Sequence, residues 1–115
     1  MTFTSTKINY IELNVSNIEH SKQFYGDAFG WSFIDYGADY CEFSDGEMTG
    51  GFTTQAPVNP GGPMIVLYDV ALEEVYARIT RAGGKIVRET FQFPGGERFE
   101  FQDPDGYILA VWRHV

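Results

Sequence analysis

Apolar and polar side chains alternate along residues 8–15 of the chain. Ile11 and Leu13 fall on one side of this stretch, and Tyr10 and Glu12 fall on the other. A period of two is typical of a strand whose two faces meet different surroundings. The stretch therefore predicts a strand with one buried face and one polar face.

The residues that follow change to a helical period. Ser16 and Glu19 have the spacing of a capping box, Asn17 is an alternative cap, and Gly30 is suited to end the helix. The apolar stripe consists of Ile18, Phe24, Tyr25, Ala28 and Phe29. These residues predict a helix that covers the apolar face of the preceding strand.

Three short strands are expected after this helix, in the segments WSFID, DYCEFS and MTGGFTT. Gly37 and the Asp45-Gly46 pair separate them, as turn residues do. The first part of the chain therefore predicts one βαβββ unit.

The same pattern of apolar and glycine positions recurs in the second half of the chain. A shift of 54 positions aligns Ile11 with Ile65, Leu13 with Leu67, Ile18 with Leu72, Ala28 with Ala82 and Gly30 with Gly84. Such agreement indicates an internal repeat. We expect an α+β fold of two tandem βαβββ repeats, at about residues 7–55 and 63–114. A Pro- and Gly-rich linker at about 54–63 joins them within a single domain, 1–115.

Neither repeat is large enough to bury its own sheet. The two should pack together within one chain, or pair across a dimer. Either arrangement leads us to expect curved mixed sheets around a central cavity, with the helices on the outer face and the polar, aromatic sheet faces lining the cavity. In the second repeat, the Pro94-Gly95-Gly96 turn is expected to form a plain hairpin, with a lid over the cavity as the alternative.

Composition and charge narrow the classes of function. The net charge of −8 disfavours nucleic-acid binding, which depends on Lys and Arg. The chain has no run apolar enough to span a membrane, and its start, residues 1–10, lacks the layout of a secretion signal. A lone cysteine, Cys41, allows no internal disulfide and is expected to be a core residue, with a reactive thiol as the alternative. We therefore expect a cytoplasmic protein with no nucleic-acid or membrane partner.

Three segments together resemble the vicinal oxygen chelate superfamily, which includes glyoxalase I, extradiol dioxygenases and the fosfomycin and bleomycin resistance proteins. They are IELNVSNIEHSKQFYGDAFGW (11–31), EVYARITRAGGKIV (74–87) and DPDGYILAVW (103–112). The resemblance covers nearly the whole chain. It implies the duplicated fold but no single reaction, because one fold hosts several chemistries.

Metal-dependent members of that superfamily carry His, Gln or Glu at four inward-facing positions. The resemblance maps these positions onto Tyr10, Gly50, Met64 and Ala110, with Gly51 as the alternative to Gly50. None of these residues supplies the imidazole or carboxylate that zinc, manganese or iron prefers. His20 and His114 are not expected to converge on the cavity, so we expect no metal and no cofactor.

The first hypothesis is a metal-free protein, likened to the bleomycin resistance members, that forms a homodimer and binds a small organic molecule. The ligand would be aromatic or cationic in character, because aromatic faces stack on planar groups and attract cations. The expected lining consists of Tyr10, Glu12, Phe52, Met64, Tyr68, Ala110 and Trp112.

The alternative is an enzyme of the same superfamily: a glyoxalase-like lyase or isomerase, or a dioxygenase-type enzyme. It would use Glu12 as base with Tyr10 as acid, or a non-standard metal site. Against a catalytic role, Glu12 can simply be solvated or paired with Arg98. A third alternative is a partner-recognition module whose cavity is filled by its own aromatic side chains.

Overall fold

Each half of the chain folds as a strand, a helix and three further strands. The computed structural model describes residues 6–115. The first half contains β1 (Tyr10–Asn14), α1 (Ile18–Phe29), β2 (Ser32–Asp35), β3 (Tyr40–Ser44) and β4 (Thr49–Thr53). The second contains β5 (Ile65–Tyr68), α2 (Leu72–Arg81), β6 (Lys85–Phe93), β7 (Gly96–Gln102) and β8 (Ile108–His114). This order confirms the two predicted βαβββ repeats.

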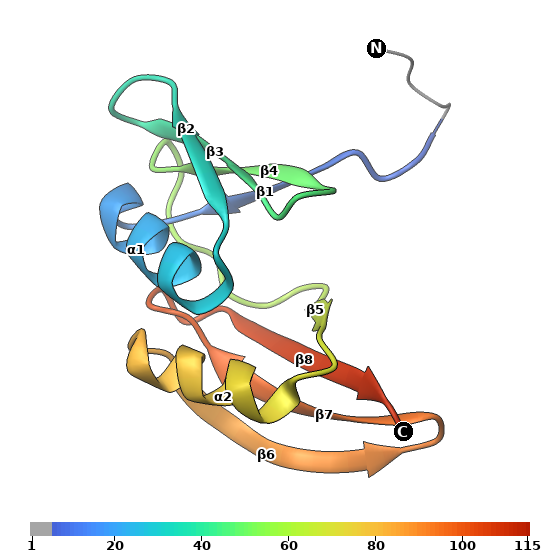
Figure 1. Cartoon of the computed structure of the whole chain (residues 1–115). Coiled ribbons are helices and arrows are strands. Elements are labelled where there is room, and N and C mark those ends of the chain that lie inside the picture. The colour runs from blue at the N-terminus through green and yellow to red at the C-terminus, as the bar shows by residue number, and fades with distance from the viewer. Residues whose placement is uncertain (1–5) are drawn as a thin grey trace.

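The two repeats form two separate mixed sheets with the same topology (Figure 1). The strand order is β1-β4-β3-β2 in the first sheet and β5-β8-β7-β6 in the second. The first strand of each repeat pairs in parallel with the last, and the other pairs are antiparallel. β1 and β5 are therefore edge strands. β6 and β7 form the expected hairpin at Pro94-Gly95-Gly96.

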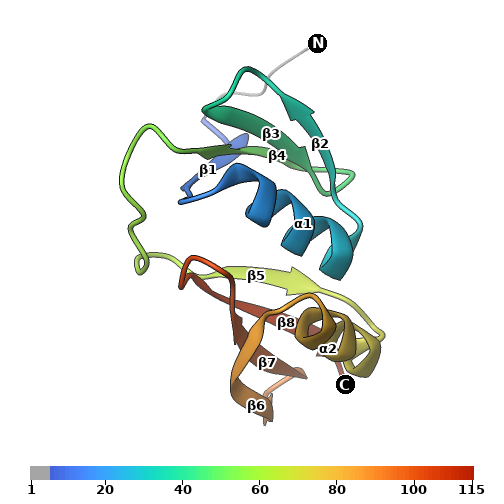
Figure 2. The same cartoon turned by 90° about the vertical axis from the view of Figure 1, so that its left-hand side faces the viewer.

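One hydrophobic core serves both repeats. The ring of Phe101, on β7, lies 6.2 Å from that of Phe24 and 5.8 Å from that of Phe29, both on α1. Helix α1 also contacts α2, below the first sheet in Figures 1 and 2. The helix-facing sides of both sheets thus share one interior, and their opposite faces point away from it. In this respect the chain differs from the expected arrangement, because α1 is covered by α2 and the second repeat instead of lying on the outside.

The first helix begins at a different cap from the one expected first. Asn17 Oδ1 accepts a hydrogen bond of 3.1 Å from the backbone N–H of His20, so Asn17 is the cap and the Ser16–Glu19 capping box is wrong. Ser16 instead donates its hydroxyl to Asp105, at 2.6 Å. At the other end Gly30 takes the expected left-handed conformation, with φ of 73°.

The β7–β8 turn connects the second repeat to the first through side-chain hydrogen bonds. The buried Tyr25 hydroxyl, on α1, donates to Asp103 at 2.7 Å. The Tyr107 hydroxyl donates to the carbonyl oxygen of Asn14 at 2.7 Å and accepts from the N–H of Asn59, in the linker, at 3.1 Å. This single turn therefore holds α1, the end of β1 and the linker in place.

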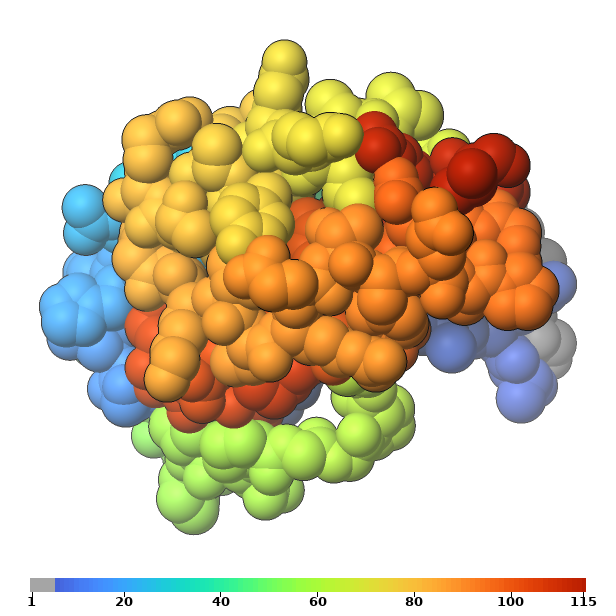
Figure 3. Space-filling view, turned by 90° about the horizontal axis from the view of Figure 1, so that it is seen from below, coloured from blue at the N-terminus to red at the C-terminus, as the bar shows by residue number. Residues whose placement is uncertain are grey.

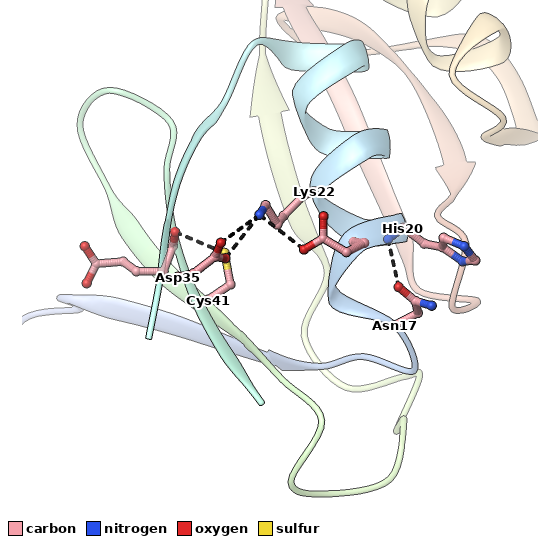
Figure 4. A network of polar contacts seen from close by, with 7 residues as sticks. Asn17, His20, Lys22, Asp35 and Cys41 are labelled. Carbon is pink, nitrogen blue, oxygen red and sulfur yellow. Dashed lines mark hydrogen bonds and ion pairs between the residues drawn. The ribbon is translucent and has the colours of Figure 1, made fainter. Parts of the chain in front are cut away.

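Cys41 is fully buried in the core, as its expected role as a small core residue requires. Beside it, Lys22 on α1 forms an ion pair with Asp35 on β2 at 3.1 Å and with Glu19 at 3.3 Å (Figure 4). Burial, together with the Asp35 carboxylate, raises the pKa of the Cys41 thiol to about 11.

The Cys41 thiol should resist modification in the folded protein. With 5,5′-dithiobis(2-nitrobenzoate) at pH 8, we expect no labelling over a time in which N-acetylcysteine reacts fully, and one equivalent after unfolding in guanidinium. Because the folded pKa is raised from 9.0 to about 11, this group favours the folded state below pH 9 and loses that contribution as the pH rises through 11. Rapid labelling of the native protein would contradict the burial.

Among residues 6–115, no helix combines the length and the apolar character needed to cross a membrane. Residues 1–5 belong to the stretch on which the expectation about secretion rests, and they lie outside the described part of the chain.

Candidate functional site

A groove of about 730 Å³ runs between the two edge strands, β1 and β5. Tyr10 and Glu12 line it from β1, Met64 and Val66 from the start of the second repeat, and Ile108 from β8. The linker forms one border, and Figure 3 shows a gap between the linker, in yellow-green, and the second sheet. The volume lies within the range of about 300–1,000 Å³ typical of small-molecule sites, which speaks against a cavity filled by its own side chains.

Strand alternation and the register of the first sheet place the polar groups. β1 pairs with β4 so that Glu12 lies opposite Gly51 and Leu13 opposite Phe52. Because side chains alternate between faces, Tyr10 and Glu12 share the face that points away from the core. On β3, the flanking Cys41 and Phe43 are buried in the core, so Tyr40 belongs to the same polar face.

Tyr10, Tyr40 and Glu12 form one hydrogen-bonded cluster, which we call the Tyr-Tyr-Glu cluster. The Tyr40 hydroxyl donates to Glu12 Oε1 at 2.9 Å, and the Tyr10 and Tyr40 hydroxyl oxygens lie 2.7 Å apart. Burial, followed by the hydrogen bonds with Tyr10 and Glu12, raises the pKa of Tyr40. Tyr40 is not among the residues that the sequence predicts to line the cavity. Its alternation with Cys41 and Phe43 is the signal that could have placed it on this face.

The two adjacent glycines of β4 have opposite roles. A Cβ atom at Gly50 would meet the Phe43 ring and the carbonyl oxygen of Ile11, so this position faces the interior. A Cβ atom at Gly51 would overlap the Tyr40 hydroxyl and lie 2.9 Å from that of Tyr10. The mapping of the second metal-ligand position onto Gly50 is therefore wrong by one residue, and Gly51 is the position on the polar face.

The donor set does not fit a divalent ion. Tyr10 and Met64 line the groove, whereas Ala110 is fully buried, with Val66 and Glu100 as its strand neighbours. The space beside Gly51 holds the Tyr40 hydroxyl. Within residues 6–115, no three His, Cys, Asp or Glu side chains gather in a way that could hold an ion. Phenol, thioether and methyl groups are poor substitutes for imidazole and carboxylate.

A second candidate surface lies on the outward face of the second sheet, and we call it the aromatic face. Its rings belong to Tyr68, Phe93, Trp112 and His114. Trp112 lies 5.0 Å from Tyr68, 6.0 Å from Phe93 and 4.7 Å from His114. Tyr68 and Trp112 do not line the groove beside Tyr10. His114 contacts two of the expected ligand-binding residues, Tyr68 and Trp112, whereas His20 is exposed on α1.

Two expectations about individual side chains are wrong. Phe52 is fully buried against Tyr25 and Phe43, at 5.5 and 4.9 Å between ring centroids, and lines no polar face. Glu12 bonds to Tyr40 and not to Arg98, which donates to Glu100 at 3.0 Å.

The comparisons with known proteins identify the family. The family model described as "Glyoxalase/Bleomycin resistance protein/Dioxygenase superfamily" matches residues 7–111. The chain belongs to this superfamily. The match extends over the first repeat, the linker and the second repeat as far as Val111 in β8.

Relatives of the glyoxalase superfamily are found among both curated proteins and solved structures. CFP32 of Mycobacterium bovis, whose name describes it as a candidate glyoxylase, is 26% identical over 121 residues, covering 93% of this chain and 46% of CFP32. The chain thus spans about half the length of the curated relatives that it matches.

Two solved structures illustrate the shared fold. A glyoxalase-related enzyme from Fulvimarina pelagi superimposes with a TM-score of 0.80 at 24% identity, covering 95% of this chain and 88% of its own. A family enzyme from Burkholderia phytofirmans gives 0.81 at 12% identity, covering 93% of this chain and 98% of its own. At such identities the likeness shows the fold of the glyoxalase superfamily and no particular reaction.

Proposed function

We propose that this member of the glyoxalase superfamily is a binding protein that takes up a small organic molecule, aromatic or cationic in character, without a divalent metal. The observation that carries the proposal is the Tyr40 hydroxyl, which occupies the space beside Gly51 where a metal ligand would project. The groove beside it combines polar groups on β1 with apolar walls on β5 and β8. Such a mixture suits a ligand with a flat apolar part.

The proposal includes a homodimer. Both outward sheet faces carry exposed aromatic side chains, with Tyr10 37% and Tyr68 47% exposed. The Tyr-Tyr-Glu cluster and the aromatic face lie on different sheets and do not share a groove in one chain. A second copy can bring its aromatic face opposite the cluster, so that both repeats contribute to one site. Light scattering after gel filtration should give twice the monomer mass.

A second candidate function is catalysis by Glu12 and Tyr10, as a lyase, an isomerase or a dioxygenase-type enzyme. The hydrogen bonds that link Glu12, Tyr40 and Tyr10 favour it, because they connect a carboxylate base to a phenol at the groove. In such an enzyme Glu12 would take a proton from the substrate and Tyr10 would donate one. Loss of turnover of a carbonyl substrate in Glu12→Gln, with binding retained, would establish it.

A thermal-shift screen tests the binding function. We expect planar aromatic molecules and aromatic cations to raise the melting temperature, and zinc, nickel and manganese ions to leave it unchanged, because only a ligand that prefers the native state stabilises it. Tyr10→Ala and Trp112→Ala should each weaken a ligand found in the screen by about tenfold, through lost ring contacts.

The control for these variants is Tyr36→Ala, which removes an exposed ring outside the groove. It should leave the affinity unchanged. About one tightly held transition-metal ion per purified chain would refute the metal-free site.

A further inference from the structure

The hydrogen atoms of the Tyr-Tyr-Glu cluster can be assigned from its chemistry. The Glu12 carboxylate has no hydrogen to give, so Tyr40 donates its only hydroxyl hydrogen to Glu12. The remaining bond, between the two hydroxyls, must then be donated by Tyr10 to Tyr40. Both phenol hydrogens are therefore used within the cluster.

What remains for a ligand is a set of acceptors. The Tyr10 oxygen keeps its lone pairs, and the second oxygen of Glu12, on an exposed side chain, receives no hydrogen bond from residues 6–115. Tyr10 and Glu12 line the groove, whereas Tyr40 stands behind them and does not. A polar group that enters the groove at this point meets lone pairs only.

The charged side chains on this sheet face are negative, which also favours a cationic ligand. Glu42 lies across from Gly51 on β3, on the polar face shared with Glu12. The ion pairs formed within residues 6–115 include neither Glu12 nor Glu42. The basic side chains that form ion pairs have carboxylate partners other than Glu12 and Glu42; they are Lys22, Arg78, Arg88, Arg98 and Arg113.

On these grounds, and resting on the proposed binding function, we infer that the ligand carries a cationic N–H donor, such as an ammonium, amidinium or guanidinium group. In this arrangement Tyr40 is the positioning residue that holds Glu12 and Tyr10 in place to receive the donor. Hydrogen bonds between ionised partners are stronger than neutral ones, and a donor is the only partner that an acceptor cluster can satisfy. The side chains of Met64, Val66 and Ile108 supply the apolar wall for the remainder of the ligand.

Three probes of nearly equal shape test the donor requirement: benzamidine, benzamide and benzoate. Melting temperatures measured over a concentration series give a dissociation constant for each. We expect benzamidine to bind about tenfold more tightly than benzamide, and benzoate to give no shift. Glu12→Gln should remove the preference for benzamidine. Glu47→Gln, which makes the same change of charge on an exposed side chain outside the groove, should retain it.

Tyr40→Phe tests the positioning role. It should weaken benzamidine by about five- to tenfold while leaving the affinity for benzamide unchanged, because only the cation depends on a correctly held Glu12. Tyr36→Phe, at an exposed tyrosine with no hydrogen bond from its hydroxyl within residues 6–115, is the matched control and should change neither affinity. An equal loss for both probes would show that Tyr40 acts only through folding and would refute its positioning role.

Two outcomes would overturn the cation requirement. Equal or tighter binding of benzamide or benzoate would do so and leave the proposed binding function intact. No binding of any of the three probes would also do so, while the broader ligand screen with Tyr10→Ala and Trp112→Ala would still decide the binding function by itself.

Discussion

Replacing Phe52 by Ala should lower the free energy of unfolding by about 3–5 kcal/mol. Phe52 is fully buried on β4, and its ring contacts those of Tyr25, Phe33 and Phe43. Truncation would leave a cavity in the centre of the first repeat that neighbouring rings cannot fill without leaving their own contacts. Guanidinium unfolding followed by circular dichroism measures the loss.

The contrasting variant is Trp112→Ala, which removes a larger ring from the partly exposed aromatic face. It should cost less than half as much stability as Phe52→Ala, because solvent already reaches one side of the ring. Equal losses for the two variants would mean that Trp112 belongs to the core, and the aromatic face would then be no candidate for binding.

Tyr25→Phe should destabilise the protein by about 1–3 kcal/mol at pH 7, because it leaves the buried Asp103 carboxylate without a donor at Oδ2. Burial raises the pKa of Asp103, and the hydrogen bond from Tyr25 opposes that rise. Loss of the bond should raise the pKa of Asp103 further.

The sign of the pH dependence follows from this direction. Since the folded pKa of Asp103 lies above its ordinary value of 3.8, the folded state holds the proton more tightly than the unfolded state. This contribution to stability is complete below pH 3.8 and is lost as the pH rises through the folded pKa. The deficit of Tyr25→Phe should therefore be larger at pH 7 than at pH 4. Tyr76→Phe, which removes an exposed bond of 2.9 Å to Glu89, is the control and should cost little at either pH.

The fold was predictable because its signals are local or repeated. Alternation along residues 8–15 and the 54-residue shift are enough to define both repeats, and each strand follows from a short pattern bounded by turn residues. The register of β4 was not predictable in the same way. Gly50 and Gly51 are adjacent and have no side chains, so neither indicates a face.

The aromatic character of Phe52 suggests a binding surface, but Phe52 lies in the core. Its partner across the strands is Leu13, a residue of the apolar face, and that pairing decides its side of the sheet. The Tyr-Tyr-Glu cluster is not predictable from the sequence for a different reason. Tyr40 is 30 residues from Tyr10, and only the order β1-β4-β3 brings their hydroxyls together.

The bond between Tyr25 and Asp103 also distinguishes the two halves of the chain. Asp45 accepts backbone N–H groups within the β3–β4 turn, from residues two and three positions further on, whereas Asp103 accepts them in the β7–β8 turn from residues two and four positions further on. The residue that matches Tyr25 in the second repeat is Ile79. The bond can thus form in one direction only. A chain assembled from two second repeats would have the carboxylate without a phenol. The two halves share one topology and are nevertheless not interchangeable at this bond.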